Sequence, residues 1–428
     1  MRFFIPGLAL VLLATSAPAL ARGDIVVDAG RGPVTVMLPA GYNPAQPAPL
    51  VLLLHSYLFG GAFQESYMQF GSLVDSHGFV YAFPEGMVDS TGSPYWNATD
   101  TCCDINGTGN DDATYLKDLV DAIKAQVAID NRRVHLIGHS NGGAMAYAMA
   151  CKYPETFGSI AVFAGYTYWD DSLCDPYESV HVLHIHGTGD LIVSYFGGTQ
   201  PLLGPYPGAV ESIEQWATYN GCGLGQDNSA PNLNLDALIF GSETSVRRYP
   251  SNCAEGGSAE LWTMAFGGHT PVFTGNFAPA VIDYLLTHPK PGLGENFCEA
   301  LANSTGSPAI AQALGSTSVT ANDLTLRARP MTTGESGIFY YGPLEIQAAF
   351  GNGVRCVGAG GIGITRLSVT QADAAGVLTR SVDLSMPATP SGQITVGSTW
   401  KFQAWFRDPA GGGAGFNLSD GLSIDFTP

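Results

Sequence analysis

Basic residues are scarce in this chain, and charged residues of any kind make up only 13% of it. There are 18 Lys and Arg against 37 Asp and Glu, which gives a formal net charge of -19 over 428 residues. A protein with this charge repels the phosphates of nucleic acids and the headgroups of anionic lipids. We therefore expect neither nucleic acid nor a membrane surface as a partner.

No apolar run beyond the N-terminus approaches the roughly 20 residues that a membrane-spanning helix needs. The N-terminus itself combines Met1-Arg2, an apolar run from Phe3 to Ala14, and the small-residue site Ala19-Leu20-Ala21. A positive end, a short apolar stretch and an Ala-x-Ala site are typical of a secretory signal peptide, with a membrane anchor as the alternative. We predict a cleaved signal over residues 1–21 and a secreted mature protein.

Cys-x-x-Cys pairs, a frequent sign of a zinc site, are absent among the eight cysteines. Export exposes thiols to oxidation, so disulfides are expected instead. We predict that Cys222 pairs with Cys253 and that Cys298 pairs with Cys356. The adjacent cysteines at 102 and 103 are expected to bridge elsewhere, to those at 151 and 174.

From residue 24 to about 288, short β-rich runs alternate with helical patterns, which predicts a mostly parallel sheet covered by helices. Several runs are continuously apolar, as strands buried on both faces should be. Strands are expected at residues 34–38, 49–55, 79–83, 133–138, 160–164, 180–186 and 259–266. Helices are expected at residues 113–129, 144–150 and 210–216, the first capped by Asp111 or Asp112.

The pattern changes after residues 289–296, whose proline and glycine content is typical of a linker. Beyond it, short runs of alternating apolar and polar residues are separated by turn-forming clusters. They predict an antiparallel β-sandwich over residues 297–428, with strands at 324–329, 337–341, 364–370, 399–406 and 422–426. We therefore expect an α/β domain over residues 22–288 and a small all-β domain after it.

Residues 138–143 read Gly-His-Ser-Asn-Gly-Gly and hold the only Gly-x-Ser-x-Gly of the chain. A β-branched run leads into the motif, and an alanine-rich helical run leads out of it. In the α/β-hydrolase fold such a turn strains the central residue, lifts its hydroxyl above the sheet and aims a helix N-terminus at the same place. Ser140 is the candidate nucleophile, with a helix-capping serine as the alternative.

A serine hydroxyl becomes nucleophilic when an imidazole, oriented by a carboxylate, accepts its proton. In α/β hydrolases the acid and then the histidine follow the nucleophile, each after a later strand. Asp190 lies in a glycine-rich turn after the strand at 180–186, and His269 follows the strand at 259–266. We predict a triad of Ser140, Asp190 and His269. The alternatives carry less weight, because they lie in a polar loop (Asp170, Asp171, Asp175), beside the linker (His288) or on a buried strand as core histidines (His184, His186).

The oxyanion of the reaction needs two main-chain N–H donors, which we expect from Tyr57, in the loop after an early strand, and from Asn141. Trp96 and Trp169 are candidates to wall an apolar acyl site, with a place in the core as the alternative. Histidines and acids do not cluster at metal-ligand spacing, so no catalytic metal and no cofactor is expected. Activity is then expected to survive chelation.

Taken together, several segments resemble the secreted esterase family that contains polyhydroxybutyrate depolymerases and feruloyl esterases. The matching pieces, in order along residues 30–288, are Gln64-Glu65-Ser66-Tyr67, Tyr95-Trp96-Asn97-Ala98-Thr99-Asp100, Asp111-Asp112, Gly138-His139-Ser140-Asn141-Gly142-Gly143, His184-Ile185-His186-Gly187-Thr188-Gly189-Asp190, Asn220-Gly221-Cys222 and Gly267-Gly268-His269. The resemblance implies hydrolysis of an extracellular ester, either a polyester or a feruloyl or acetyl ester of a polysaccharide. The C-terminal part resembles a module of unestablished role in secreted bacterial proteins.

Two other classes of function compete with this interpretation. One is a binding or adhesive protein on a hydrolase scaffold that has lost its activity, and the other is a serine peptidase, which the same triad permits. All the candidate catalytic residues precede residue 270, so the chemistry is expected to be complete without the β domain. That domain carries Tyr340, Tyr341, Trp400 and Trp405, which could hold an insoluble surface or fill its core.

Overall fold

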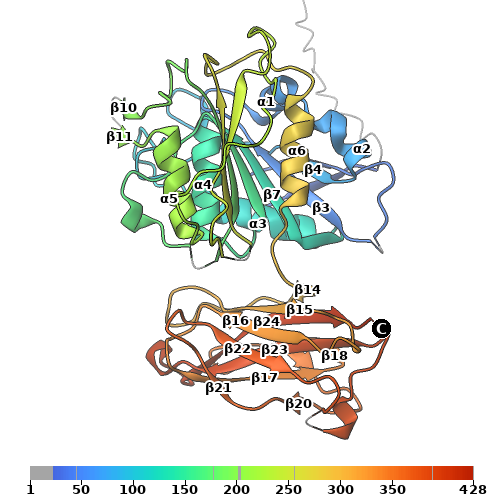
Figure 1. The fold of residues 1–428 in the computed structure, drawn as a ribbon. Helices are drawn as coiled ribbons and strands as arrows, with labels where there is room; N and C mark the ends of the chain where they lie inside the picture. Colours follow the sequence, from blue (N-terminus) through green and yellow to red (C-terminus); the bar gives the residue numbers. More distant parts are fainter. Residues whose placement is uncertain are drawn as a thin grey trace, which may run out of the picture.

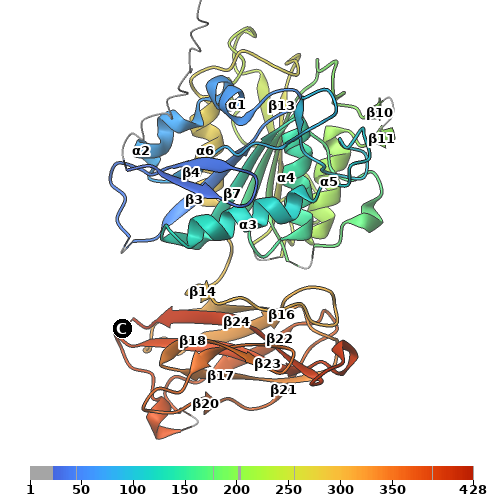
Figure 2. The same cartoon turned by 180° about the vertical axis from the view of Figure 1, so that it is seen from behind.

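The fold is described from a computed structural model over residues 23–44, 46–176, 178–200, 204–254, 256–387 and 389–427. The predicted signal peptide lies outside the described residues. An α/β domain stands above a β domain in Figure 1, and Figure 2 shows the same two parts from behind. Within the described part of the chain, no helix has the length and apolarity needed to cross a membrane.

The α/β domain is built on a nine-stranded sheet in the order β1-β2-β4-β3-β7-β8-β9-β13-β12. Strands β4, β3, β7, β8, β9 and β13 run parallel in its middle, and antiparallel β1, β2 and β12 lie toward the edges. Their bounds are β1 Ile25–Asp28, β2 Pro33–Met37, β3 Ala48–Leu54, β4 Val80–Ala82, β7 Ile129–His139, β8 Ser159–Phe163, β9 His181–Gly187, β12 Thr244–Arg248 and β13 Ser258–Met264. The predicted parallel sheet is confirmed.

Helices cover both faces of this sheet, as the alternating sequence pattern predicted. Leu119 of α3, Met145 of α4 and Ile213 of α5 belong to the core on one face. Met68 of α1 and Val281 of α6 belong to the core on the other. Their bounds are α1 Gly61–Met68, α2 Val74–His77, α3 Asp112–Lys124, α4 Asn141–Lys152, α5 Ala209–Tyr219 and α6 Phe277–Thr287. Each buried aliphatic or aromatic side chain contributes about 1.5 to 3 kcal/mol, so these two cores hold the layers together.

Helix α3 ends at Lys124, five residues before its predicted end. Ile129 already belongs to β7, where it pairs with Ala48 of β3. The end of the predicted helix is therefore part of a strand, although its apolar residues have helical spacing. Asp111 caps the helix by accepting the backbone N–H of Thr114 at 3.0 Å. Asp112 is buried instead and forms an ion pair with Arg31.

The β domain is a sandwich of two sheets around one core, which includes Leu326, Phe339 and Phe402. One sheet has the order β14-β24-β23-β17-β20 with β21 beside β17, and the other has the order β15-β16-β22. Their bounds are β14 Glu295–Phe297, β15 Ile310–Gly315, β16 Leu324–Arg329, β17 Ser336–Gly342, β20 Thr365–Arg366, β21 Thr370–Gln371, β22 Leu378–Val382, β23 Thr399–Arg407 and β24 Phe416–Asp425. Smaller ladders and single turns complete the fold: β5 Met87–Val88 with β6 Pro94–Tyr95, β10 Gly198–Gln200 with β11 Gly204–Tyr206, β18 Leu344–Phe350 with β19 Gly353–Gly358, and 3₁₀ turns at residues 70–73, 171–173, 390–392 and 409–411.

Two expected strands of the β domain are corrected. The strand predicted at 364–370 is split into β20 and β21, and β24 begins at residue 416 rather than 422. Trp400, Tyr340 and Tyr341 are buried, which agrees with the core alternative that the sequence left open. Trp405 packs against Phe416 at a ring-centroid distance of 5.4 Å. These aromatics fill the interior, so the outer face of the domain does not present them as a group.

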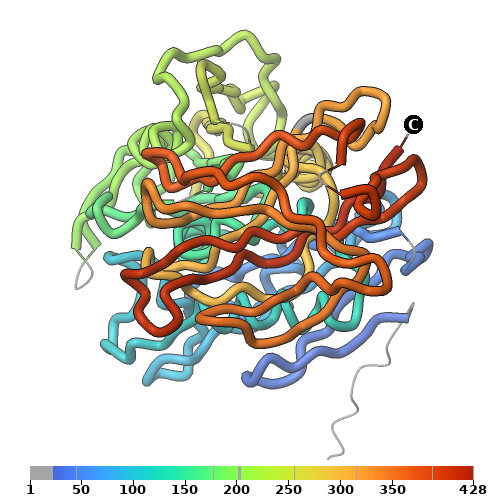
Figure 3. The backbone as a smooth tube through the Cα atoms, turned by 90° about the horizontal axis from the view of Figure 1, so that it is seen from below, coloured from blue at the N-terminus to red at the C-terminus, as the bar shows by residue number. Residues whose placement is uncertain are grey.

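The segment predicted as a linker over 289–296 contacts the amino-terminal edge of the large sheet. Strand β14 already begins at Glu295, and Lys290 is buried, where its Nζ lies 2.8 Å from Glu178 Oε2. Glu178 also accepts a hydrogen bond from Gln312 of β15 at 3.1 Å. The side chain of Asn131 donates to the carbonyl of Asn296 at 2.7 Å. Since Glu178 and Asn131 lie at the amino-terminal ends of β9 and β7, the β domain packs under that edge of the sheet, as Figure 3 shows from below.

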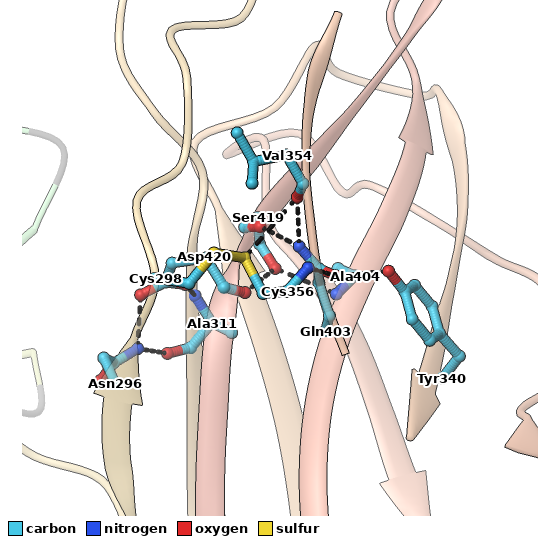
Figure 4. Close-up of a disulfide and its surroundings, with 10 residues drawn as sticks. All are labelled: Asn296, Cys298, Ala311, Tyr340, Val354, Cys356, Gln403, Ala404, Ser419 and Asp420. Carbon is cyan, nitrogen blue, oxygen red and sulfur yellow. Dashed lines mark hydrogen bonds between the residues drawn. A yellow bond between two sulfur atoms is a disulfide. The ribbon is translucent and has the colours of Figure 1, made fainter. Parts of the chain in front are cut away.

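The structure contains the predicted disulfides Cys222–Cys253 and Cys298–Cys356. Figure 4 shows the second one beside buried Asp420, which accepts hydrogen bonds from the N–H of Ala311 at 2.6 Å and from the Asn296 amide at 2.7 Å. Burial raises the pKa of Asp420 well above its usual value. The disulfide therefore closes over a polar cluster that ties β14, β15 and β24 together.

The expected partners of Cys102 and Cys103 were wrong. These two cysteines pair with each other, and Cys151 pairs with Cys174. The reason is the length of α4. Cys102 lies at the start of this helix, where the side-chain amide of Asn141 is 3.3 Å from the sulfur of Cys102. Cys151 lies ten residues further along the helix, about 15 Å away at 1.5 Å per residue, beyond the reach of a disulfide.

Candidate active site

Ser140 occupies the sharp turn between β7 and α4, at the carboxyl-terminal edge of the sheet. Its backbone has φ 55° and ψ -116°, a strained conformation for a residue with a side chain. A Cβ on Gly138 would lie 2.0 Å from the carbonyl oxygen of Gly142, and one on Gly142 would lie 2.2 Å from that of Leu54. Both glycines are therefore sterically required, and the turn raises Ser140 at the N-terminus of α4 as the motif predicted.

Asp190 and His269 are in direct contact. Asp190 follows β9 and accepts the Nδ1–H of His269 on Oδ2 at 2.7 Å. Its other oxygen, Oδ1, accepts the backbone N–H groups of Ile192 at 2.8 Å and Val193 at 2.9 Å. Burial raises the pKa of Asp190, but hydrogen bonds from His186, His269 and the backbone outweigh it and hold the pKa below its usual range. Asp190 therefore stays ionised and orients His269 with Nε2 free to act as a base.

His139, the residue before Ser140, connects the base to the nucleophile strand. Its Nε2 lies 3.0 Å from the backbone carbonyl of His269, and the two rings are 5.1 Å apart. A carbonyl only accepts, so His139 Nε2 carries the proton in this bond. Within the described residues no hydrogen bond joins Ser140 to His269, a bond that in free enzymes often tightens only when substrate is present.

The same histidine links the site to the loop after β3. Its Nδ1 accepts from the Gln64 side-chain amide at 3.1 Å, and Gln64 Oε1 accepts the N–H of Ser56 at 3.1 Å. Burial, and then the neighbouring His269, lower the pKa of His139 to about 3, so the ring is neutral. Sequence reasoning missed Gln64 and His139 as organising residues. Their only signal was membership of the segments that carried the family resemblance.

The two expected oxyanion donors lie on either side of this network. The N–H groups next to Tyr57 are engaged, that of Ser56 by Gln64 and that of Leu58 by the carbonyl of Pro94 at 3.0 Å. The Tyr57 side chain fixes the loop by donating to Asp89 at 2.5 Å. Asn141 is the first residue of α4, where backbone N–H groups have no partner inside the helix. The arrangement leaves the N–H groups of Tyr57 and Asn141 as the candidates for this role.

The two tryptophans expected near substrate have different positions. Trp96 is fully buried, in agreement with the place in the core that the sequence left open. Its backbone exchanges two hydrogen bonds of 2.8 Å with the Asn141 side chain, and its indole N–H donates to the carbonyl of His55 at 3.1 Å. Trp96 therefore holds the Asn141 side chain and the backbone at His55 in place. Trp169 is exposed and borders a groove of about 490 Å³ along α5, whose lining includes no residue of the predicted triad.

An apolar rim surrounds this edge of the domain. It consists of large exposed side chains from helix α1, from the loops after β3, β9 and β13 and from the segment before β12: Leu58, Phe59, Phe63, Leu191, Ile192, Phe196, Leu238, Phe240, Phe266 and Val272. Phe240 and Leu191 are essentially fully exposed, at 105% and 95%. Residues 56–69, 187–200, 232–243 and 265–276, which carry the rim, contain no Lys or Arg. Exposed apolar groups in such number indicate an interaction surface.

Comparison with known proteins agrees with the geometry. A family model described as "Putative esterase" matches residues 30–242, which include Ser140 and Asp190. Feruloyl esterase B of Piromyces equi is 26% identical over 243 residues, 55% of this chain and 42% of that protein. Poly(3-hydroxyalkanoate) depolymerase C of Paucimonas lemoignei is 30% identical over 162 residues, 37% of this chain and 38% of that protein. Acetylxylan esterase A of Aspergillus ficuum is 24% identical over 252 residues, 50% of this chain and 79% of that protein. The chain thus spans less than half the length of the first two relatives.

Proposed function

The chain belongs to the esterase family, and on that basis we propose that it is a secreted carboxylic-ester hydrolase that works through an acyl-enzyme on Ser140. The observation that carries the proposal is the Asp190–His269 hydrogen bond of 2.7 Å at the edge where the strained turn presents Ser140. Export is part of the proposal. It is supported by the predicted signal peptide and by the disulfides of both domains.

The reaction follows from these positions. His269 Nε2 accepts the hydroxyl proton as Ser140 Oγ attacks the ester carbonyl, and Asp190 stabilises the imidazolium that forms. The N–H groups of Tyr57 and Asn141 then receive the oxyanion, a contribution worth about 3 to 4 kcal/mol for each donor. His269 returns the proton to the leaving alkoxide. Water, activated by the same histidine, hydrolyses the acyl-enzyme.

An active-site-directed fluorophosphonate tests this function against the two alternatives. We expect stoichiometric labelling of Ser140, located by peptide mapping, because only an activated serine reacts at a useful rate. A folded protein that remains unlabelled would support a binding protein on a hydrolase scaffold. Matched ester and amide substrates separate the remaining classes, since a peptidase would also turn over the amide at a measurable rate and an esterase would not.

The apolar rim supports a solid polyester as the substrate within this class. The rim adjoins the catalytic loops, since Leu191 follows Asp190 and Phe266 lies three residues before His269. A surface that covers the rim must therefore also meet the nucleophile. Relatives named for polyhydroxyalkanoate and for feruloyl and acetylxylan esters leave both polymer classes in the proposal. The exposed apolar side chains of the rim favour the more apolar of the two.

Replacing Phe240 and Phe266 by Ser tests this choice. We expect adsorption to a polyhydroxyalkanoate film, and its hydrolysis, to fall about tenfold or more, because each exposed phenyl ring loses its burial against the polymer. Turnover of a short soluble ester should change little. The matched control replaces Val369 and Met386, which are exposed on the β domain, by Ser in the same way. Equal losses from the two double variants would exclude the rim as the surface that binds the polymer. Preferential hydrolysis of feruloylated polysaccharide would make a polysaccharide ester, rather than a polyester, the substrate.

A further inference from the structure

Three buried polar side chains that contact one another, Tyr147, His184 and His186, form a file that leads from the core to Asp190. Tyr147 of α4 lies with its hydroxyl 2.7 Å from His184 Nδ1. His184 Nε2 lies 3.1 Å from His186 Nδ1. His186 Nε2 lies 2.9 Å from the carbonyl of Val193 and 3.3 Å from Asp190 Oδ2. The three side chains before Asp190 are at most 1% exposed.

The protons in this file have one consistent arrangement. The Val193 carbonyl can only accept, so His186 Nε2 must carry a proton. In a neutral ring His186 Nδ1 then accepts, which requires a proton on His184 Nε2. His184 Nδ1 is left as an acceptor for the Tyr147 hydroxyl. Every donor in the file thus points toward Asp190.

The environment of His184 favours a neutral ring. Burial, and then the neighbouring His186, lower the pKa of His184 well below its usual value. The rings of His184 and His186 stack at a centroid distance of 5.3 Å. Core packing alone would explain the stacking, and the sequence predicted no more than that. It does not explain why His186 Nε2–H lies within reach of the same carboxylate oxygen that receives the proton of His269.

We propose that His186 is a positioning residue of ester hydrolysis, whose Nε2–H holds Asp190 Oδ2 in place for His269. The inference rests on the proposed function. Asp190 Oδ2 accepts the Nδ1–H of His269 and lies 3.3 Å from His186 Nε2, while Oδ1 is fixed by the N–H groups of Ile192 and Val193. The contact with His186 fixes the direction of the carboxylate and reduces the pull of Oδ2 on the proton of His269. The carbonyl of Val193, which can only accept, keeps His186 in the tautomer with the proton on Nε2.

The effect on pH dependence follows from the same contacts. The titratable groups around Asp190 are His186 and His184 on β9, His269 after β13, His139 on β7 and the hydroxyl of Tyr195, whose ring packs on His186 at 5.7 Å. Without the donor from His186, the full charge of Asp190 Oδ2 faces His269 and stabilises its protonated form. The acid limb of the kcat/KM profile should then move to higher pH.

Proton positions can be measured without reference to activity. In protein labelled with ¹⁵N-histidine, long-range ¹H–¹⁵N spectra should show both His184 and His186 as neutral Nε2–H tautomers near pH 7, assigned through His184→Gln and His186→Gln. A proton on Nδ1 of His186 would overturn the proposal whatever the enzyme hydrolyses. This measurement stands even if the proposed ester hydrolysis proves wrong.

Two variants of His186 test the catalytic consequence, with active sites counted by fluorophosphonate. His186→Phe keeps the ring and removes the donor, and kcat per labelled site on a soluble ester should fall about ten- to hundredfold with KM nearly unchanged. His186→Gln places an amide N–H near the position of Nε2 and should restore most of kcat and the acid limb. Tyr147→Phe removes a buried hydroxyl at the far end of the file and should change kcat less than threefold.

The outcomes separate the two proposals. Wild-type protein that neither labels nor hydrolyses any ester overturns the proposed function. Active wild type with unchanged kcat and acid limb in His186→Phe overturns the role of His186. Equal losses in His186→Phe and Tyr147→Phe, with an unmoved acid limb, would mean general disturbance of the core and would also overturn it. If His186→Phe does not fold, the comparison of His186→Gln with wild type and the tautomer spectra decide.

Discussion

Ser140→Ala is expected to lower kcat/KM for a soluble ester by a factor on the order of 10⁴ to 10⁶. The variant removes the only atom that can form the acyl-enzyme, while the oxyanion donors and the Asp190–His269 pair remain. The fold should survive, because alanine meets the same backbone strain at φ 55° as serine does and is smaller. Steady-state kinetics and thermal unfolding of the two proteins measure the two halves of this expectation.

Ser66→Ala provides the matched control. Ser66 is an exposed serine on α1, near the same edge of the domain, and its replacement should leave kcat/KM within about twofold of wild type. A Ser140→Ala protein that is folded and retains more than about one part in a hundred of the activity would place the nucleophile elsewhere. Fluorophosphonate labelling of that protein would then identify the reacting residue.

The second large effect is expected for Asp190→Asn, which should reduce kcat by about 10³- to 10⁴-fold with a small change in KM. Oδ1 of Asp190 accepts two backbone N–H groups, so asparagine must place its carbonyl oxygen there. Its NH₂ group then occupies the position of Oδ2 and faces the protons of His269 Nδ1 and His186 Nε2. Donor opposite donor forces His269 to turn or to change tautomer, and Nε2 no longer serves as the base.

The pH dependence of stability gives an independent check on Asp190. Its folded pKa lies below the usual value, so its charge contributes stability that is present above the unfolded pKa of about 3.9. That contribution is lost as the pH falls through the folded pKa. The stability difference between wild type and Asp190→Asn should therefore shrink below about pH 4 in urea unfolding. Asp171→Asn, in the exposed loop that offered rival acids, should change neither kcat nor this dependence.

Local patterns carried most of what the sequence predicted correctly. The apolar runs of the parallel strands and the Gly-x-Ser-x-Gly turn are set by residues next to one another, so a single sequence displays them. Asp190 and His269 were predicted because each follows such a strand. Gln64 and His139 act through partners far away in the chain, and nothing in their own neighbourhoods distinguishes them from core residues. His186 lies only four residues before Asp190, but its place on a buried strand predicted a core histidine.

The partners expected for Cys102 and Cys103 were wrong for a related reason. Whether Cys151 can reach Cys102 depends on which end of α4 each occupies, a fact that appears only when the helix is placed on the sheet. The composition of residues 289–296 is typical of a linker. The burial of Lys290 against Glu178 depends on a partner more than 100 residues away, which composition does not reveal.

The junction at Glu178 and Lys290 also decides which way the molecule faces. The β domain is clamped under the amino-terminal ends of the parallel strands, and the rim lies at their carboxyl-terminal ends. Anything fastened to the β domain, whether a cell envelope, a column matrix or a fusion partner, therefore leaves the rim pointing outward. A protein attached to a support through its β domain would therefore keep the rim accessible to a substrate surface, and this orientation needs no further engineering.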